Sequence, residues 1–200
     1  MNHLRALCFL AVMAFAAAAL GQAAAKPAAT PTPAPTIGGV IDREISILER
    51  EFVSAAEAMP DDKFNFAPAS LNINGSDYKG VKTFAEEVRH VAATNFQLWS
   101  PVTGEKPPIE SSEDNGPPQL KTKAEIIKYL KDSFAFGHKA AQSLTSERAA
   151  LAMVPNPFGQ GQTTKLFCTS FAVAHAFDHY GQMVEYLRMN GIIPPASRQQ

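Results

Sequence analysis

The sequence has few cysteines and no concentration of charge of one sign. Two of its 200 residues are cysteines, and 18 Lys and Arg residues are balanced by 19 Asp and Glu residues, for a formal net charge of −1. No run of basic residues forms a stripe, so the chain lacks the electrostatic footprint of a nucleic-acid-binding protein. With 46% hydrophobic and 18% charged residues, the composition also excludes a disordered or collagen-like chain.

Long hydrophobic runs are also missing, except for one near the N-terminus. Residues 6–20 form an unbroken apolar run, which follows a short positively charged segment and precedes the small residues Ala23 to Ala25. This pattern predicts a secretory signal peptide over residues 1–25, cut after Ala25. The run is shorter than the roughly 20 residues that span a membrane. We therefore expect a periplasmic or secreted protein with no stable membrane anchor after cleavage.

Cleavage of the signal peptide would leave Cys168 as the only cysteine. The mature chain would then have no internal disulfide, even in an oxidising compartment. Its stability must come from a packed core, for which about 160 residues suffice. We expect the Cys168 thiol to be buried and inert, which is the more common state of a lone cysteine.

The rest of the chain divides into a linker and one helical domain. Residues 26–38 are rich in Pro, Ala and Thr, which is typical of an extended, semi-rigid linker. Residues 39–198 are expected to be an all-α four-helix bundle, because four stretches show helical apolar spacing and none alternates long enough for a convincing strand. The predicted helices cover residues 39–59, 81–99, 122–144 and 164–190, with a short extra helix over residues 146–153.

Prolines mark the two long connections of this bundle. Pro101 is expected to end the second helix, and residues 101–120 hold five prolines and two glycines. A connection of this length inside a compact domain is typical of a lid or a disordered strip. Substrate contacts are expected from this loop and from residues 60–79.

Two histidines stand four residues apart on the last predicted helix. His175 and His179 project from the same face, one turn apart, and a helical projection places both on the core-facing stripe. Such a pair can chelate one divalent cation, because neutral imidazole is a common ligand for Zn, Ni and Fe. A hydrogen-bonded core pair fits the spacing as well, since the pattern is not specific.

A third histidine ligand could come from either of two helices. His90 and His138 are the other histidines downstream of the predicted cleavage site. His138 lies near the centre of the apolar stripe of its helix, whereas His90 lies roughly 120° from the centre of its own stripe. Periodicity alone therefore favours His138.

Two segments resemble a known family. The stretch HAFDHYGQMVEYLRMNGIIPPASR, residues 175–198, is similar to the last helix of the DinB-like/YfiT-like superfamily, and residues 88–92 are similar to its second-helix segment. The resemblance extends over most of residues 40–198. It implies a four-helix bundle in which one histidine of the second helix and two of the fourth hold a divalent metal ion. Position by position these are His90, His175 and His179, with His138 as a weaker candidate and Zn, Ni, Fe or Mn as the ion.

Three histidine ligands leave coordination positions open for water or substrate. The resemblance implies relatives that are thiol-dependent transferases and isomerases, and hydrolysis fits the ligands equally well. We therefore expect an exported metal-dependent hydrolase or thiol-dependent transferase that acts on a small molecule, with its catalytic residues unassigned. The alternative is a non-catalytic metal- or ligand-binding bundle, or a module that forms a homodimer. A fourth ligand such as His138 or Asp178 would close the site and favour this alternative.

Other polar and aromatic side chains near these histidines have competing interpretations. Asp178 and Gln182 flank the histidine stripe and could orient an imidazole, or they could be ordinary exposed helix residues. Tyr186 is expected to pack in the core, and Trp99 to cap it. The glutamates at positions 86 and 87 are expected on a solvated face.

Overall fold

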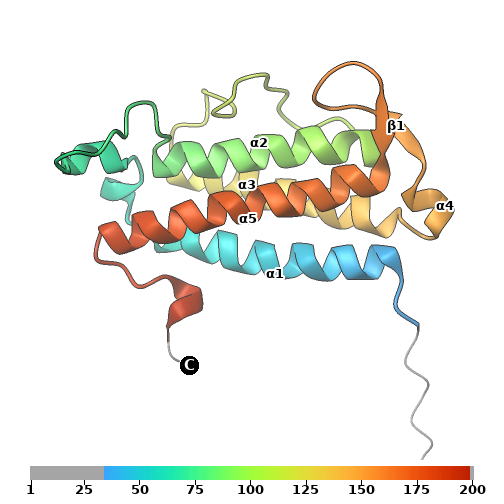
Figure 1. Ribbon diagram of the computed structural model, residues 1–200, viewed down its shortest axis with the longest axis horizontal. Coiled ribbons are helices and arrows are strands. Elements are labelled where there is room, and N and C mark those ends of the chain that lie inside the picture. The colour runs from blue at the N-terminus through green and yellow to red at the C-terminus, as the bar shows by residue number, and fades with distance from the viewer. Residues whose placement is uncertain (1–33, 199–200) are drawn as a thin grey trace, which may run out of the picture. The chain divides into compact units, whose positions relative to one another are not determined.

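The computed structural model describes residues 34–198, so the predicted signal peptide and most of the predicted linker lie outside the described residues. Within that range four long helices run side by side (Figure 1). None of the described helices is long and apolar enough to cross a membrane. The long helices are α1 (Ile37–Ala58), α2 (Phe84–Thr103), α3 (Lys123–Gln142) and α5 (Lys165–Met189).

The order of the helices around the bundle differs from their order in the chain. Both α1 and α2 pack against α3 and against α5, so α5 lies between α2 and α1 (Figure 1). The helices thus follow the cyclic order α1, α3, α2, α5, with α3 and α5 on opposite corners. Apolar side chains from all four fill the centre, among them the fully buried Phe52, Trp99, Leu130 and Ala176. Trp99 is therefore part of this core.

Threonine side chains define where the long helices begin. Thr36, Thr83, Thr122 and Thr164 each accept a hydrogen bond from a backbone N–H of the first turn, which satisfies a donor that the helix leaves free. The first helix starts at Ile37, so the last two residues of the predicted linker are helical. Gly38 is buried there, and a Cβ at this position would lie 2.5 Å from the carbonyl oxygen of Ala141. The absence of a side chain thus allows α1 to approach α3 closely.

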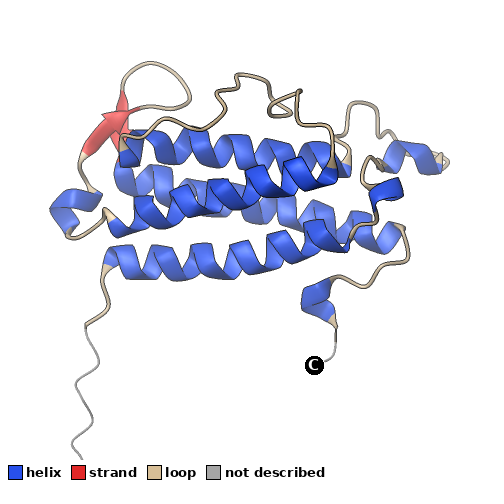
Figure 2. Cartoon of the chain, turned by 180° about the vertical axis from the view of Figure 1, so that it is seen from behind, coloured by secondary structure: helices blue, strands red, loops and turns tan. Residues whose placement is uncertain are grey.

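Two predicted boundaries are wrong. Helix α2 continues through Pro101 to Thr103, because a proline in the last turn removes only one backbone donor from the helix. The helix expected over residues 146–153 is a single turn, α4 (Glu147–Ala150), and a hairpin follows it (Figure 2). Its strands β1 (Met153–Pro155) and β2 (Gln162–Thr164) are antiparallel and too short to leave an alternating pattern in the sequence. Short 3₁₀ turns cover Asp61–Lys63, Pro68–Leu71 and Pro195–Ser197.

Residues 104–122 form a loop that is docked onto α2. The guanidinium of Arg89 donates a hydrogen bond to the carbonyl oxygen of Leu120 over 3.1 Å. Gly116, with φ of 71°, packs so closely that a Cβ would lie 2.6 Å from the carbonyl oxygen of Arg89. Lys82 pairs with Asp114 and donates a hydrogen bond to the side chain of Asn115 over 2.6 Å. These contacts make the loop an ordered cover of α2, where the sequence predicts a lid or a disordered strip.

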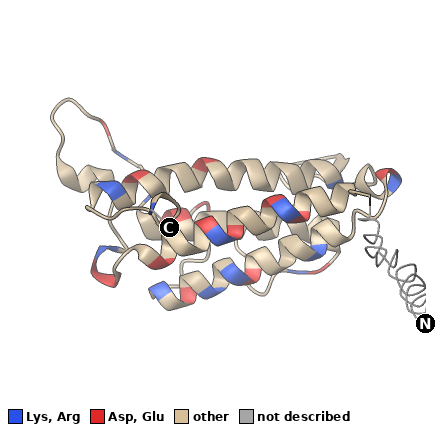
Figure 3. Cartoon of the chain, turned by 90° about the horizontal axis from the view of Figure 1, so that it is seen from below, with Lys and Arg blue, Asp and Glu red and all other residues tan. Residues whose placement is uncertain are grey.

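Charged residues are distributed over the outer faces of the helices. In Figure 3 acidic and basic positions are interspersed along the described helices, and no basic stripe crosses this view. Ion pairs use several of them, such as Lys131 of α3 with Glu57 of α1 at 2.7 Å, and Lys139 of α3 with Glu105 of the docked loop at 2.8 Å. The outer surface therefore has no region that concentrates one sign of charge on this side.

Candidate metal centre

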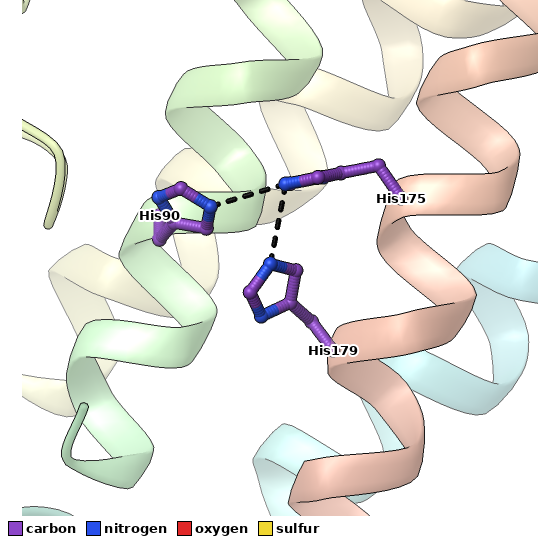
Figure 4. A group of neighbouring side chains, drawn as sticks. All are labelled: His90, His175 and His179. Atoms are coloured by element: carbon purple, nitrogen blue, oxygen red, sulfur yellow. Dashed lines mark hydrogen bonds between the residues drawn. The ribbon is translucent and has the colours of Figure 1, made fainter. Parts of the chain in front are cut away.

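Three histidines from two neighbouring helices point toward one another (Figure 4). The Nε2 atom of His175 lies 3.1 Å from Nε2 of His90 and 3.2 Å from Nε2 of His179. In residues 34–198 this is the one group of three or more His, Cys, Asp or Glu side chains whose ligand atoms all lie within 4.8 Å of one another. The structure thus brings together the three residues that the family resemblance implies.

Hydrogen bonds on the far side of two rings determine which nitrogen carries the proton. The Nδ1 atom of His90 contacts the backbone carbonyl oxygen of Asp114, and Nδ1 of His179 lies 2.5 Å from a carboxylate oxygen of Glu87. A carbonyl or carboxylate oxygen can only accept, so Nδ1 of each ring donates. In this tautomer the Nε2 lone pair of each ring is free and faces the centre of the group, as metal binding requires.

The contacts of the third ring, that of His175, indicate whether a cation fits this arrangement. Nε2 of His175 can carry at most one proton, so at most one of its two contacts is a hydrogen bond, and at least one Nε2 lone pair of His90 or His179 is left without a donor. Tetrahedral zinc with bonds of about 2.0–2.1 Å to nitrogen would separate its ligand atoms by about 3.3 Å. The two separations from Nε2 of His175 are close to that value, and a cation between the rings would give the Nε2 lone pair of each ring a partner. The three residues therefore fit a divalent metal ion.

Burial keeps two of these imidazoles neutral. Burial, together with the smaller effects of the neighbouring rings of His179 and His90, lowers the pKa of His175 to about 4. Burial also lowers the pKa of His90, against the opposing effect of the hydrogen bond to Asp114. Since a metal binds the unprotonated imidazole, both rings are in the metal-binding form at neutral pH.

Glu87 is a site residue that the sequence analysis placed wrongly. Its residue surface is 1% exposed, and its carboxylate orients the ring of His179, whereas we expected it on a solvated face. The signal was available in the spacing, because Glu87 lies three residues after Phe84 and four before Val91, which are both buried. A carboxylate on a buried helix face needs a partner, and here that partner is the imidazole of His179 on α5.

The residues expected to flank the histidines behave differently. Asp178 is exposed, and its only side-chain hydrogen bond among the described residues comes from Gln182 at 3.5 Å. Neither side chain contacts an imidazole, so both are ordinary helix polar residues. Tyr186 is buried as expected, and its hydroxyl donates a hydrogen bond to the carbonyl oxygen of Lys82 over 3.0 Å.

His138 lies at a different helix seam. Its Nδ1 is 2.7 Å from a carboxylate oxygen of Asp42 and its Nε2 is 3.1 Å from one of Glu49, both on α1. Periodicity favoured His138 as the third member of the group, and this is wrong because α3 and α5 occupy opposite corners of the bundle. His90 lies on the flank of α2, which is where α2 meets α5. A flank position is therefore the one that faces the histidines of α5.

A cavity of about 550 Å³ opens beside His90 and His175. Ala93, Phe158 and Phe171 give it an apolar side, and residues 111–114 of the docked loop give it a polar one. The loop over residues 60–79, from which we also expected substrate contacts, contributes no residue to this cavity. No fourth His, Cys, Asp or Glu joins the three histidines in the described part of the chain. The group is therefore open on one side to a space that can hold a small molecule.

Comparison with known proteins agrees with the fold and the histidine group. No curated protein matches the sequence. The sequence model of the DinB superfamily matches residues 44–183, which is more than half of the chain and includes all three histidines. This chain belongs to the DinB superfamily.

Proposed function

We propose that this protein is a divalent-metal-dependent enzyme that hydrolyses a small molecule, with the ion held by His90, His175 and His179. The observation that carries the proposal is the open side of the three-histidine group, which faces a cavity of about 550 Å³. Catalytic metal sites keep such a position for water or substrate, whereas closed structural sites fill all four with protein ligands.

The chain's own groups would hold the rings in place. The carboxylate of Glu87 and the carbonyl oxygen of Asp114 each accept a hydrogen bond from a ring Nδ1, which fixes both the ring orientation and the tautomer. A bound ion would supply Lewis acidity, which activates water or a thiol as a nucleophile at neutral pH. The cavity would place the substrate beside His90 and His175.

We also propose that the protein works outside the cytoplasm. The support is the signal-peptide pattern of residues 1–25 and the single cysteine that would remain after cleavage. Sequencing the N-terminus of protein recovered from the cell envelope or the medium tests this. A chain that begins at Lys26 is expected, and an uncut chain in the cytoplasm would contradict the proposal.

The metal content of the mature chain, residues 26–200, tests the proposed function first. Purified without chelators, the protein is expected to hold about one equivalent of a transition metal by mass spectrometry. His90→Ala, His175→Ala and His179→Ala should each lose it, whereas His138→Ala should retain it because that ring is paired with α1. Absence of metal after incubation with Zn, Ni, Mn and Fe would contradict the proposal and favour a non-catalytic bundle.

A substrate screen with the loaded protein tests the reaction. Ester and amide libraries are expected to give hydrolysis that a chelator abolishes and the same metal restores. Turnover that requires an added low-molecular-weight thiol, with no hydrolysis in its absence, would overturn the hydrolase and indicate a thiol-dependent transferase at the same site.

A further inference from the structure

Three exposed phenylalanines form a ladder that leads to the histidine group. Phe167 and Phe171 are one turn apart on α5 and their rings stack at 5.4 Å, and the ring of Phe171 lies 6.3 Å from that of His175. Phe158 packs edge-on against Phe171 at 5.5 Å from the tip of the hairpin. Contiguous exposed aromatic rings at the edge of a cavity are typical of a ligand-binding surface.

The hairpin tip that carries Phe158 is held in place. Gln97 on α2 donates a hydrogen bond from Nε2 to the carbonyl oxygen of Pro157 over 2.8 Å. The side chain of Asn156 accepts one from the backbone N–H of Phe158 over 3.1 Å. Gln97 and Phe158 both line the cavity. The apolar wall is thus formed by Phe171 of α5, Phe158 of the hairpin and Ala93 of α2, and Gln97 of α2 holds the hairpin tip in place.

The opposite wall has a distinct charge. It consists of residues 111–114, which include Glu113 and Asp114. No Lys or Arg is among the residues that line the described cavity. Lys82 does not line the cavity and its charge is paired with Asp114, so Glu113 is the acidic side chain of this wall that has no ion pair among the described residues. A carboxylate or phosphate on the ligand would therefore meet acidic side chains on this wall, while a neutral or positively charged group would not be repelled.

We propose that the cavity binds a neutral or cationic small molecule whose apolar ring packs on Phe158 and Phe171 while its reacting group lies at the three histidines. This deepens the proposed function and rests on it, because the reacting group is placed by the metal site. The two phenylalanines determine which substrates fit, and the loop over residues 111–114 selects against anions. Anionic compounds such as aromatic carboxylates and phosphate esters are disfavoured.

Paired hydroxamates test the ring and the charge separately. Acetohydroxamate and benzohydroxamate share a metal-binding group and differ in one ring, so calorimetric titration of the metal-loaded protein isolates the contribution of the ring. We expect benzohydroxamate to bind about tenfold or more tightly than acetohydroxamate, because a ring would be removed from water. A para-aminomethyl group should preserve this affinity, and a para-carboxylate should reduce it several-fold.

Single substitutions show which side chains account for the higher affinity of the ring-containing hydroxamate. Phe171→Ala and Phe158→Ala should each remove most of the advantage of the ring while leaving the metal content and acetohydroxamate binding unchanged. Phe177→Ala is the matched control, because Phe177 is on the same helix with the same 38% exposure as Phe171 and does not line the cavity. Phe158 is on a surface hairpin, so its variant keeps the test valid if Phe171→Ala fails to fold.

The outcomes separate this proposal from the proposed function. If acetohydroxamate binds and the ring adds nothing, or if Phe177→Ala has the same effect as Phe171→Ala, the ring site is wrong and the metal site stands. If the protein takes no metal, the proposed function fails, and benzylamine and benzoate titrated into the metal-free protein then decide the ring site by nuclear magnetic resonance. Shifts at the amides of Phe158 and Phe171 with benzylamine, weaker with benzoate, would support it, and their absence would overturn it.

Discussion

The molecule holds imidazoles at two helix seams, and their surroundings are opposite. At the seam of α2 and α5 three rings face one another, and burial lowers the pKa of His90 and His175. At the seam of α1 and α3 a single ring, His138, faces two carboxylates. Burial opposes its protonation there, but the hydrogen bonds that the ring donates to the carboxylates of Asp42 and Glu49 outweigh burial and raise its pKa. The same residue type is thus prepared as a neutral ligand at one seam and as a cation at the other.

Burial disfavours the charged imidazole at both seams, so the partners of each ring decide whether its pKa is lowered or raised. The side chains of His90 and His179 are 14% and 12% exposed, and that of His138 is 27% exposed, so all three are partly buried. The ring of His138 has an acceptor at each nitrogen, so both nitrogens are best satisfied when both carry a proton. A doubly protonated ring has no lone pair for a metal. An ion pair at this seam is therefore incompatible with metal binding through His138.

The largest expected effect is the difference in metal-induced Tm shift between His175→Ala and His138→Ala, which each remove one ring from one of the two seams. Because the ion would bind only the folded protein, adding metal should raise the Tm of the wild type and of His138→Ala, and leave His175→Ala unchanged. Thermal unfolding with and without added Zn or Ni measures this. At a metal concentration of 100 times the dissociation constant the stabilisation is about 2.7 kcal/mol. Equal metal-induced shifts in all three proteins would mean that the ion binds elsewhere.

Substitution of Glu87 tests the role of the carboxylate behind His179 at the seam of α2 and α5. Glu87→Gln removes the charge that orients His179, and we expect metal affinity to fall by about 10- to 100-fold, as for other residues behind a metal ligand. Competition with a chromogenic chelator measures the change. Glu49→Gln is the control, because Glu49 meets an imidazole at the other seam, and it should leave metal affinity unchanged. Similar losses in both variants would indicate a general destabilisation.

The ion pair of His138 at the seam of α1 and α3 should make the stability of the protein depend on pH. Since folding raises the pKa of His138, its contribution is fully present below the unfolded pKa of about 6.5 and is lost as pH rises through the folded value. His138→Gln should therefore destabilise the protein more at pH 5.5 than at pH 8.5. The effect should be about 1 kcal/mol or less, because the pair is partly exposed. Denaturant unfolding at the two pH values measures it, and a difference independent of pH would argue against a charged His138.

Cys168 should give the smallest effect. It lies on α5, is fully buried, and burial raises the pKa of its thiol, so the unreactive protonated form dominates. Cys168→Ala is expected to leave metal stoichiometry unchanged and to cost only a small amount of packing energy. Metal analysis and a thiol-reactive dye on the native protein check both points. Rapid labelling of the folded protein, or loss of metal in the variant, would show that the thiol takes part in the site.

The sequence predicted the helices well because their signals are local. Apolar spacing located all four long helices, but the second was expected from residue 81, and the capping Thr83, which places its start at Phe84, was not used. The exceptions depend on context, since Pro101 is tolerated within the last turn of α2 and a three-residue strand leaves no pattern. Local signals therefore suffice for the elements and fail at their ends.

The histidine group was less accessible from the residues alone. The spacing of His175 and His179 indicated a shared face, but the angular position of His90 argued against it, and only the family resemblance pointed to it. The reason is that a site at the seam of two helices uses flank positions, whereas periodicity identifies the centre of the buried face. The cavity walls come from a loop and a hairpin that are distant in sequence, and no spacing rule places them.

The docked loop has a consequence for how this centre can be altered. His90 is oriented by a backbone carbonyl at position 114, so Asp114→Asn or Asp114→Ala leaves that acceptor in place. What holds the carbonyl there is the path of the chain, which depends on the close approach of Gly116 to α2. Substitution of Asp114 alone would therefore miss this support, which also depends on the contacts that Lys82 and Arg89 make with the loop. Inserting or deleting one residue between positions 110 and 116 would move it without touching a histidine.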